Sequence, residues 1–135
     1  MTKKIILSTL AGAATLFLLG GLIFGVLLAA PMAEFMKAFE ACAHPVPPIQ
    51  FIAFANIAMA LLYSLILNKF GISTFKGGLT AAAWISFLLI FWFDMWMFAT
   101  FTGMNVQMML FDILGNTTVG ALAGGVIGWV LGKVK

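Results

Sequence analysis

Four long stretches of nearly unbroken apolar residues alternate with short polar segments along the chain. A transmembrane helix needs about 20 mostly apolar residues, and a helix satisfies its own backbone hydrogen-bonding groups in lipid. The pattern therefore predicts an all-α integral membrane protein, a four-transmembrane-helix bundle in one domain covering residues 1–135. The predicted spans are Ile5–Ala30, Ile49–Leu67, Leu79–Phe101 and Val106–Leu131.

The first stretch follows Lys3 and Lys4 and so resembles the start of a secretory signal peptide. Its apolar run covers residues 5–30, whereas the apolar region of a signal peptide has roughly 7–15 residues. We therefore expect a retained helix, tilted in the bilayer and ended by Pro31.

The segment between the first two spans has a helical repeat of its own, with apolar residues on one side and polar residues on the other. The apolar positions are Met32, Phe35, Met36, Phe39 and Ala43, and the polar positions are Glu34, Lys37, Glu40 and His44. This spacing predicts an amphipathic helix over about residues 32–43, before the prolines at 45, 47 and 48. Such a helix lies flat on the membrane surface or caps the bundle.

The composition agrees with a lipid environment. Of the 135 residues, 64% are hydrophobic and only 8% are charged, with a mean hydropathy of +1.16. A soluble domain of this size could not bury so much apolar surface. All seven basic residues are lysines beside apolar stretches, which is a membrane pattern and not a nucleic-acid-binding one.

The lysines also predict the orientation. Four spans put the N-terminus, the second loop and the C-terminus on one side, and these segments carry every lysine except Lys37. Because cytoplasmic loops are enriched in Lys and Arg, both termini are expected in the cytoplasm. The segment with Glu34, Glu40 and His44 then faces outward, where these residues form an acidic vestibule or simply a solvated helix face.

The chain offers little of the chemistry that enzymes and metal centres need. Cys42 is the only cysteine, and His44, the only histidine, has no partner at a metal-ligand spacing. No nucleophile–base pair or phosphate-binding loop is present. We therefore expect no metal, no cofactor and no catalysis.

Small residues recur every fourth position on two of the predicted helices. The fourth span carries Gly120, Gly124 and Gly128, and the first carries Gly21 and Gly25. Small residues at this spacing let membrane helices approach closely. Packing inside the bundle is favoured over a homodimer or a contact with another membrane protein, which stays an alternative.

Two acidic residues interrupt the apolar spans. Asp94 lies nine residues before Gly103 and Asp112 lies nine residues after it. Because the last two spans join at a turn near Gly103, both carboxyl groups are expected at one depth, roughly 10–14 Å below the turn. A charged residue at this depth faces protein or water, and two facing carboxyls could share a proton.

Other polar residues within the spans give the acids candidate partners. Asn116 lies one turn after Asp112, and Asn56 and Ser64 share one face of the second span. Two readings remain open: the acids form a paired site for a proton or a cation, or each accepts separate hydrogen bonds and only fills a structural role.

The order and spacing of the spans resemble an uncharacterised family of small four-helix bacterial membrane proteins, classed as a domain of unknown function. The likeness rests on "LLGGLIFGVLLAAPMAEFM" near the end of the first span and on "GALAGGVIGWVLG" in the last. Phe24 and Gly25 stand where many members have an aromatic pair and Ser-Pro. The resemblance implies a bacterial inner (cytoplasmic) membrane location and no known chemistry.

These observations give two expected functions. One is a non-enzymatic membrane protein that binds or passes a small solute, proton or cation through an acidic site on its outer side. The other is a structural or assembly subunit that packs through its glycine stripes in a homodimer or a larger membrane complex.

Overall fold

The computed structural model describes residues 2–41 and 43–134, and this part of the chain is helical without strands. It consists of α1 (Thr2–Leu22), the π-helical segment η1 (Ile23–Leu27), α2 (Ala29–Lys37), α3 (Ile49–Lys69), α4 (Phe75–Thr100) and α5 (Val106–Lys133). Four described segments are long and apolar enough to cross a membrane, namely Lys3–Leu27, α3, α4 and α5. The prediction of four long apolar helices is therefore confirmed.

Side-chain caps fix the starts of the last two helices. The Thr74 hydroxyl accepts a hydrogen bond from the Gly77 backbone N–H at 3.1 Å. In the same way, the side-chain Oδ1 of Asn105 accepts a hydrogen bond from the Met108 backbone N–H at 2.9 Å. The prediction that the third span begins at Leu79 was therefore late by one turn, because the Thr74 cap starts α4 at Phe75. Glycines in this first turn do not prevent it from being helical.

The connection between the first two spans differs from the prediction. The first helix widens into η1, where the Leu28 N–H donates to the Ile23 carbonyl at 2.7 Å, and the chain turns at Leu28 with φ −105° and ψ 18°. The first helix thus ends at Leu27 and not at Ala30. Pro31 lies inside the first turn of α2, where its missing N–H leaves no helical bond unmade.

The amphipathic helix was predicted at about residues 32–43, but α2 covers Ala29–Lys37. Residues 38–41 continue as tighter turns, in which N–H groups bond to carbonyls three residues earlier, as from Ala38 to Phe35. The turn at Leu28 starts the helix early, which the apolar repeat does not reveal. Cys42, within the predicted helix, lies outside the described residues.

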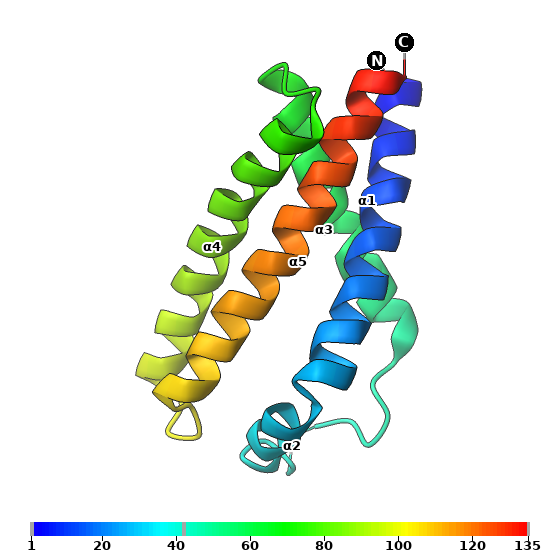
Figure 1. Cartoon of the computed structure of the whole chain (residues 1–135). Helices are drawn as coiled ribbons and strands as arrows, with labels where there is room; N and C mark the ends of the chain where they lie inside the picture. Colours follow the sequence, from blue (N-terminus) through cyan, green and yellow to red (C-terminus); the bar gives the residue numbers. More distant parts are fainter. Residues whose placement is uncertain (1, 42, 135) are drawn as a thin grey trace.

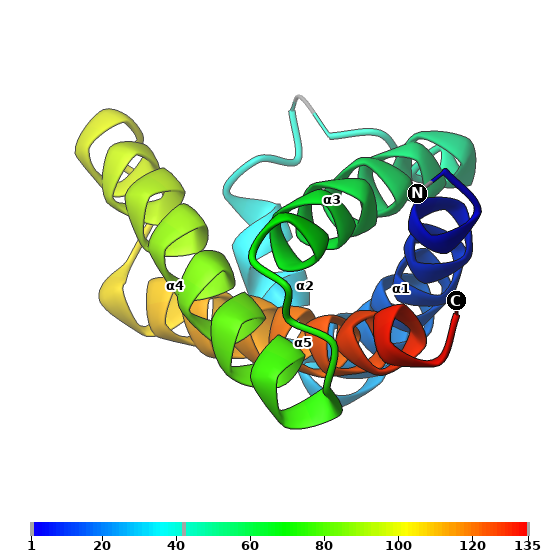
Figure 2. The same cartoon turned by 90° about the horizontal axis from the view of Figure 1, so that it is seen from above.

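The helices do not form a symmetric four-helix bundle. α1, α3 and α5 pack against one another, whereas α4 lies outside this group and packs along α5. Seen from above, α4 diverges from α3, which it touches at few points (Figure 2). Between α1 and α4 there is no contact in the described part of the chain.

The two ends of the molecule have different contents. One end holds both termini and the α3–α4 loop, and we call it the lysine end after Lys3, Lys4, Lys69, Lys76 and Lys133 (Figure 1). The opposite end, called the α2 end, holds α2 and the α4–α5 turn (Figure 1).

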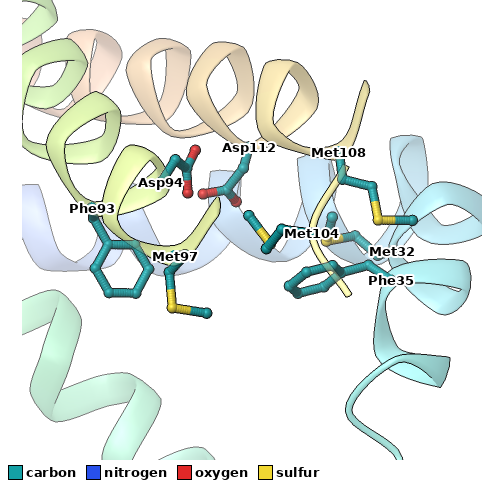
Figure 3. Close-up of a pocket in the computed structure, with 8 residues that line it drawn as sticks. All are labelled: Met32, Phe35, Phe93, Asp94, Met97, Met104, Met108 and Asp112. Atoms are coloured by element: carbon teal, nitrogen blue, oxygen red, sulfur yellow. The ribbon is translucent and has the colours of Figure 1, made fainter. Parts of the chain in front are cut away.

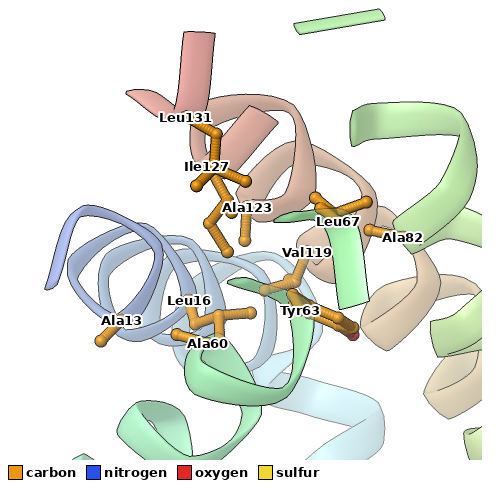
Figure 4. Close-up of a cluster of buried hydrophobic side chains, with 10 residues drawn as sticks. All are labelled: Ala13, Leu16, Ala60, Tyr63, Leu67, Ala82, Val119, Ala123, Ile127 and Leu131. Atoms are coloured by element: carbon orange, nitrogen blue, oxygen red, sulfur yellow. The ribbon is translucent and has the colours of Figure 1, made fainter. Parts of the chain in front are cut away.

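Buried side chains gather toward the lysine end. Their apolar cluster includes Leu67, Ile127 and Leu131, each at most 1% exposed (Figure 4). Small residues bring α4 and α5 together there: a Cβ on Gly124 would meet the Ala82 side chain and lie 2.7 Å from the Gly78 carbonyl oxygen. Close packing of small residues replaces the hydrophobic drive that lipid cannot supply.

Candidate functional site

Asp94 of α4 and Asp112 of α5 point toward each other near the α2 end (Figure 3). We call these two residues the acid pair. Asp94 is 2% exposed, whereas Asp112 is partly buried. The carboxyl groups are close enough to interact directly. The antiparallel α4–α5 hairpin therefore brings both acids to one depth on facing helix surfaces.

The hydrogen bonds of the acid pair are incomplete. Asn116 donates from Nδ2 to the Asp112 carboxylate Oδ1 at 3.0 Å and to the Asp112 carbonyl at 3.1 Å. By contrast, the buried Oδ2 of Asp94 has no hydrogen-bond partner among the described residues. Leaving a buried polar atom unpaired costs about 1–3 kcal/mol. A proton or a bound cation at this position would remove that cost.

A cavity of about 280 Å³ adjoins the acid pair, and we call it the acid cavity. α2 contributes part of its wall, because Met32 and Phe35 reach it from that helix (Figure 3). The remaining lining residues besides the acids are Phe93, Met97, Met104 and Met108. Among the described residues that line the cavity, the acid pair is thus the only charged part of a wall of methionine and phenylalanine.

The outward polar residues predicted from the sequence do not join this site. Glu34, Glu40 and His44 are exposed, and none of them lines the acid cavity. They sit on or just after α2, whose opposite side carries Met32 and Phe35. Among the described residues, no group of three His, Cys, Asp or Glu side chains could hold a metal ion.

The supporting polar residues take separate positions. Asn116 binds Asp112 as described, whereas Asn56 uses Nδ2 to bond the Ile52 carbonyl at 2.9 Å. Ser64 is fully buried and accepts a hydrogen bond from Ser8 at 3.1 Å, which joins α3 to α1. Of these three residues, only Asn116 belongs to the acid pair.

The glycine stripes also differ from each other. Gly120, Gly124 and Gly128 face α4, where an added Cβ would meet Ser86, Ala82 and the Thr74 carbonyl respectively. Gly21 and Gly25 have nothing within 4 Å of an added Cβ, so the expectation that they pack helices inside the bundle was wrong.

A larger cleft, which sequence reasoning missed, lies between the helices beside the acid cavity. It has a volume of about 720 Å³ and we call it the central cleft; its lining includes Gly21, Phe24, Asn56, Tyr63, Ser86 and Asn116. Met32 lines both cavities. Tyr63 and Ser86 hydrogen-bond at 2.7 Å across α3 and α4. In the sequence they are isolated hydroxyl groups within apolar runs, which carry no signal for a shared site.

Comparison of the chain with models of protein families, with curated proteins and with solved structures gives no match. The resemblance to the uncharacterised four-helix family therefore stays an expectation.

Proposed function

We propose that this protein is a non-enzymatic, multi-pass protein of the bacterial inner membrane that binds a proton or small cation at the acid pair. In this proposal the lysine end faces the cytoplasm, in agreement with the positive-inside rule. α2 then lies on the outer side over the acid cavity, and the site is reached from outside.

One observation carries the proposal: Asp94 is 2% exposed, its Oδ2 has no partner among the described residues, and its carboxyl group faces that of Asp112. Intramembrane acids that face protein are functional candidates by default. A purely structural acid would be expected to have its oxygens bonded to nearby donors. Asp112 has such a donor in Asn116, whereas the buried oxygen of Asp94 does not.

The donor groups favour a proton over a hard metal cation. Calcium binds about 6–8 oxygen ligands, and magnesium demands nearly octahedral coordination. The acid cavity offers two carboxyl groups, while its other six lining residues are Met and Phe. A single proton held between the carboxyls would satisfy the unpaired oxygen of Asp94 without further ligands.

Infrared spectroscopy of the protein in lipid tests this proposal. A proton held by the pair gives a protonated-carboxyl band at neutral pH that shifts in deuterium oxide. Asp94→Asn should abolish this band and so should Asp112→Asn, because the proton belongs to both groups. Glu34→Gln, a change at an exposed carboxyl, should leave it unaltered. An unchanged band in either Asn variant would refute the shared site.

An assembly role is the second candidate, and a separate observation favours it. Gly21 and Gly25 form an exposed pair of small residues four positions apart with open space in front of them. A second copy of the chain could pack there in the manner of small-xxx-small helix contacts. Light scattering of the purified protein should then show a dimer that Gly25→Leu converts to a monomer. A wild-type monomer would contradict this role.

A further inference from the structure

The central cleft has the size and lining of a ligand site. Binding pockets for small molecules occupy roughly 300–1,000 Å³ and combine apolar walls with a few polar groups. The cleft, at about 720 Å³, is walled by side chains such as Phe17, Phe24 and Ile52. α4 diverges from α3 (Figure 2), and residues of both helices line the cleft.

The hydrogen bonds of Tyr63 and Ser86 determine whether either hydroxyl can donate to a ligand. The Ser86 hydroxyl donates its only hydrogen to the Ala82 carbonyl at 2.6 Å. In the 2.7 Å contact between the two hydroxyls, Tyr63 must therefore be the donor. Tyr63 is only 2% exposed, and its hydroxyl has no hydrogen left to give to a ligand.

Asn116 leads to the same conclusion. Its Nδ2 makes both of its bonds to Asp112, one to the carboxylate and one to the backbone carbonyl. An amide nitrogen has two hydrogens, so only the carbonyl oxygen of Asn116 remains for a ligand in the cleft. Neither Tyr63 nor Asn116 therefore has a hydrogen to donate to a ligand, whereas Asn116 can accept a hydrogen bond from one.

The charges near the cleft have one sign. Among the residues that the structure describes, no lysine or histidine lines the central cleft or the acid cavity. Asp112 lies directly behind Asn116, with Asp94 facing it from α4. The charged residues of α2, Glu34 and Lys37, are exposed and line neither cavity. A ligand with a positive charge and N–H groups is therefore complementary to this site.

We infer that the central cleft binds an amphipathic organic cation, a molecule with an apolar body and an amino or ammonium group. The apolar body lies against the walls of α1 and α3, and an N–H group donates to the carbonyl oxygen of Asn116. The inference rests on the proposed function in one respect, because the attracting charge is that of the acid pair. Protons compete with the ligand by neutralising the pair, so affinity falls as the pH falls.

Ethidium is a suitable probe, since it is an aromatic cation with amino groups whose fluorescence reports binding. Its anisotropy is titrated with the whole protein in nanodiscs of zwitterionic lipid, and empty nanodiscs correct for partitioning. The anionic dye 1-anilinonaphthalene-8-sulfonate serves as the counterpart of opposite charge. Saturable binding of ethidium, and none of the anionic dye above the empty-disc level, is the expected result.

A cleft-filling variant tests the location. Gly21 lines the cleft with nothing within 4 Å of an added Cβ, so Gly21→Phe can occupy the cleft without a clash at its Cβ. We expect it to weaken ethidium binding by about tenfold or more, which corresponds to about 1.4 kcal/mol. Leu18→Phe, a change at a neighbouring side chain that is 69% exposed and outside the cleft, should have no effect. Light scattering and circular dichroism confirm that both variants keep the oligomeric state and helicity of the parent.

The double variant Asp94→Asn/Asp112→Asn tests the charge separately. It should weaken ethidium binding by about three- to tenfold, since the negative charge of the acid pair is lost, and it should remove the pH dependence that the pair causes. If ethidium fails to bind, or binds equally well to Gly21→Phe, the cleft assignment is wrong whatever the infrared spectra show. If ethidium binding is sensitive to Gly21→Phe but not to the double variant Asp94→Asn/Asp112→Asn, the organic-cation assignment is overturned. If the parent protein instead lacks the shared protonated-carboxyl band, the proposed function is refuted.

Discussion

Gly124→Ala is the sharpest test of how α4 and α5 pack. The added methyl would meet the Ala82 side chain and lie 2.7 Å from the backbone oxygen of Gly78. A backbone oxygen cannot rotate away as a flexible side chain can. The two helices must therefore move apart along the part of the hairpin where Gly128 also approaches Gly78.

The expected magnitude comes from two opposing effects. Alanine in a helix interior is favoured over glycine by about 0.5–1 kcal/mol, and by less where the unfolded state stays helical in detergent. Overpacking a close contact costs about 1–3 kcal/mol. The Gly124→Ala variant should therefore be about 1–3 kcal/mol less stable than a Gly→Ala variant whose added methyl meets no other atom.

Gly21→Ala is the matched control, because it adds the same methyl where nothing lies within 4 Å. Stability is measured by titrating SDS into the protein in mild detergent and following circular dichroism and tryptophan fluorescence. We expect Gly21→Ala to equal or exceed the parent in stability and Gly124→Ala to fall below it. Equal stability of the two variants would refute the close approach of α4 and α5.

Three further predictions address orientation, hydrogen bonding and charge. Reporter fusions after Gly71 should be active in the cytoplasm, whereas fusions after Ala41 should be active only outside, and the reverse result would invert the topology. Tyr63→Phe should lower the free energy of unfolding by about 0.5–1.5 kcal/mol, because the buried Ser86 hydroxyl loses the donor that Tyr63 supplies. SDS titration measures this free energy, and an unchanged midpoint would contradict the bond. As the pH rises and the last proton leaves the acid pair, the parent should lose stability through like-charge repulsion, whereas Asp94→Asn should not. SDS titrations across pH measure the stability of both proteins, and parallel curves of stability against pH would rule out a facing pair of Asp94 and Asp112.

The long helices could be predicted because apolar length is a direct signal in a membrane protein. α3 and α5 begin at Ile49 and Val106, the predicted residues, since a proline segment and a short polar turn precede them. The common depth of Asp94 and Asp112 followed from their equal offset from Gly103 and the antiparallel hairpin. That the two carboxyls point toward each other depends on helix rotation, which residue counting does not determine.

The parts that could not be predicted depend on local backbone geometry and on the choice of helix neighbours. A π turn differs from an α turn by one residue in its hydrogen bonds, and nothing in Ile23–Leu27 marks it. Gly21 and Gly25, near the start of this segment and within it, line the central cleft. The docking of α4 mainly on α5 was equally hidden, because apolar residues that face lipid look like apolar residues that face protein.

The placement of small and large side chains explains why one end of the hairpin is closed and the other is open. At the lysine end, Gly78 and Ala82 meet Gly124 and let the backbones touch. Toward the α2 end, the residues that line the space beside the two helices are large ones such as Phe93 and Met108, and a cavity separates their side chains. The acids lie at this open end beside the acid cavity, and not at the closely packed end. A substitution at the acid pair should therefore change the proposed proton binding without loss of the contacts that hold the helices together at the lysine end.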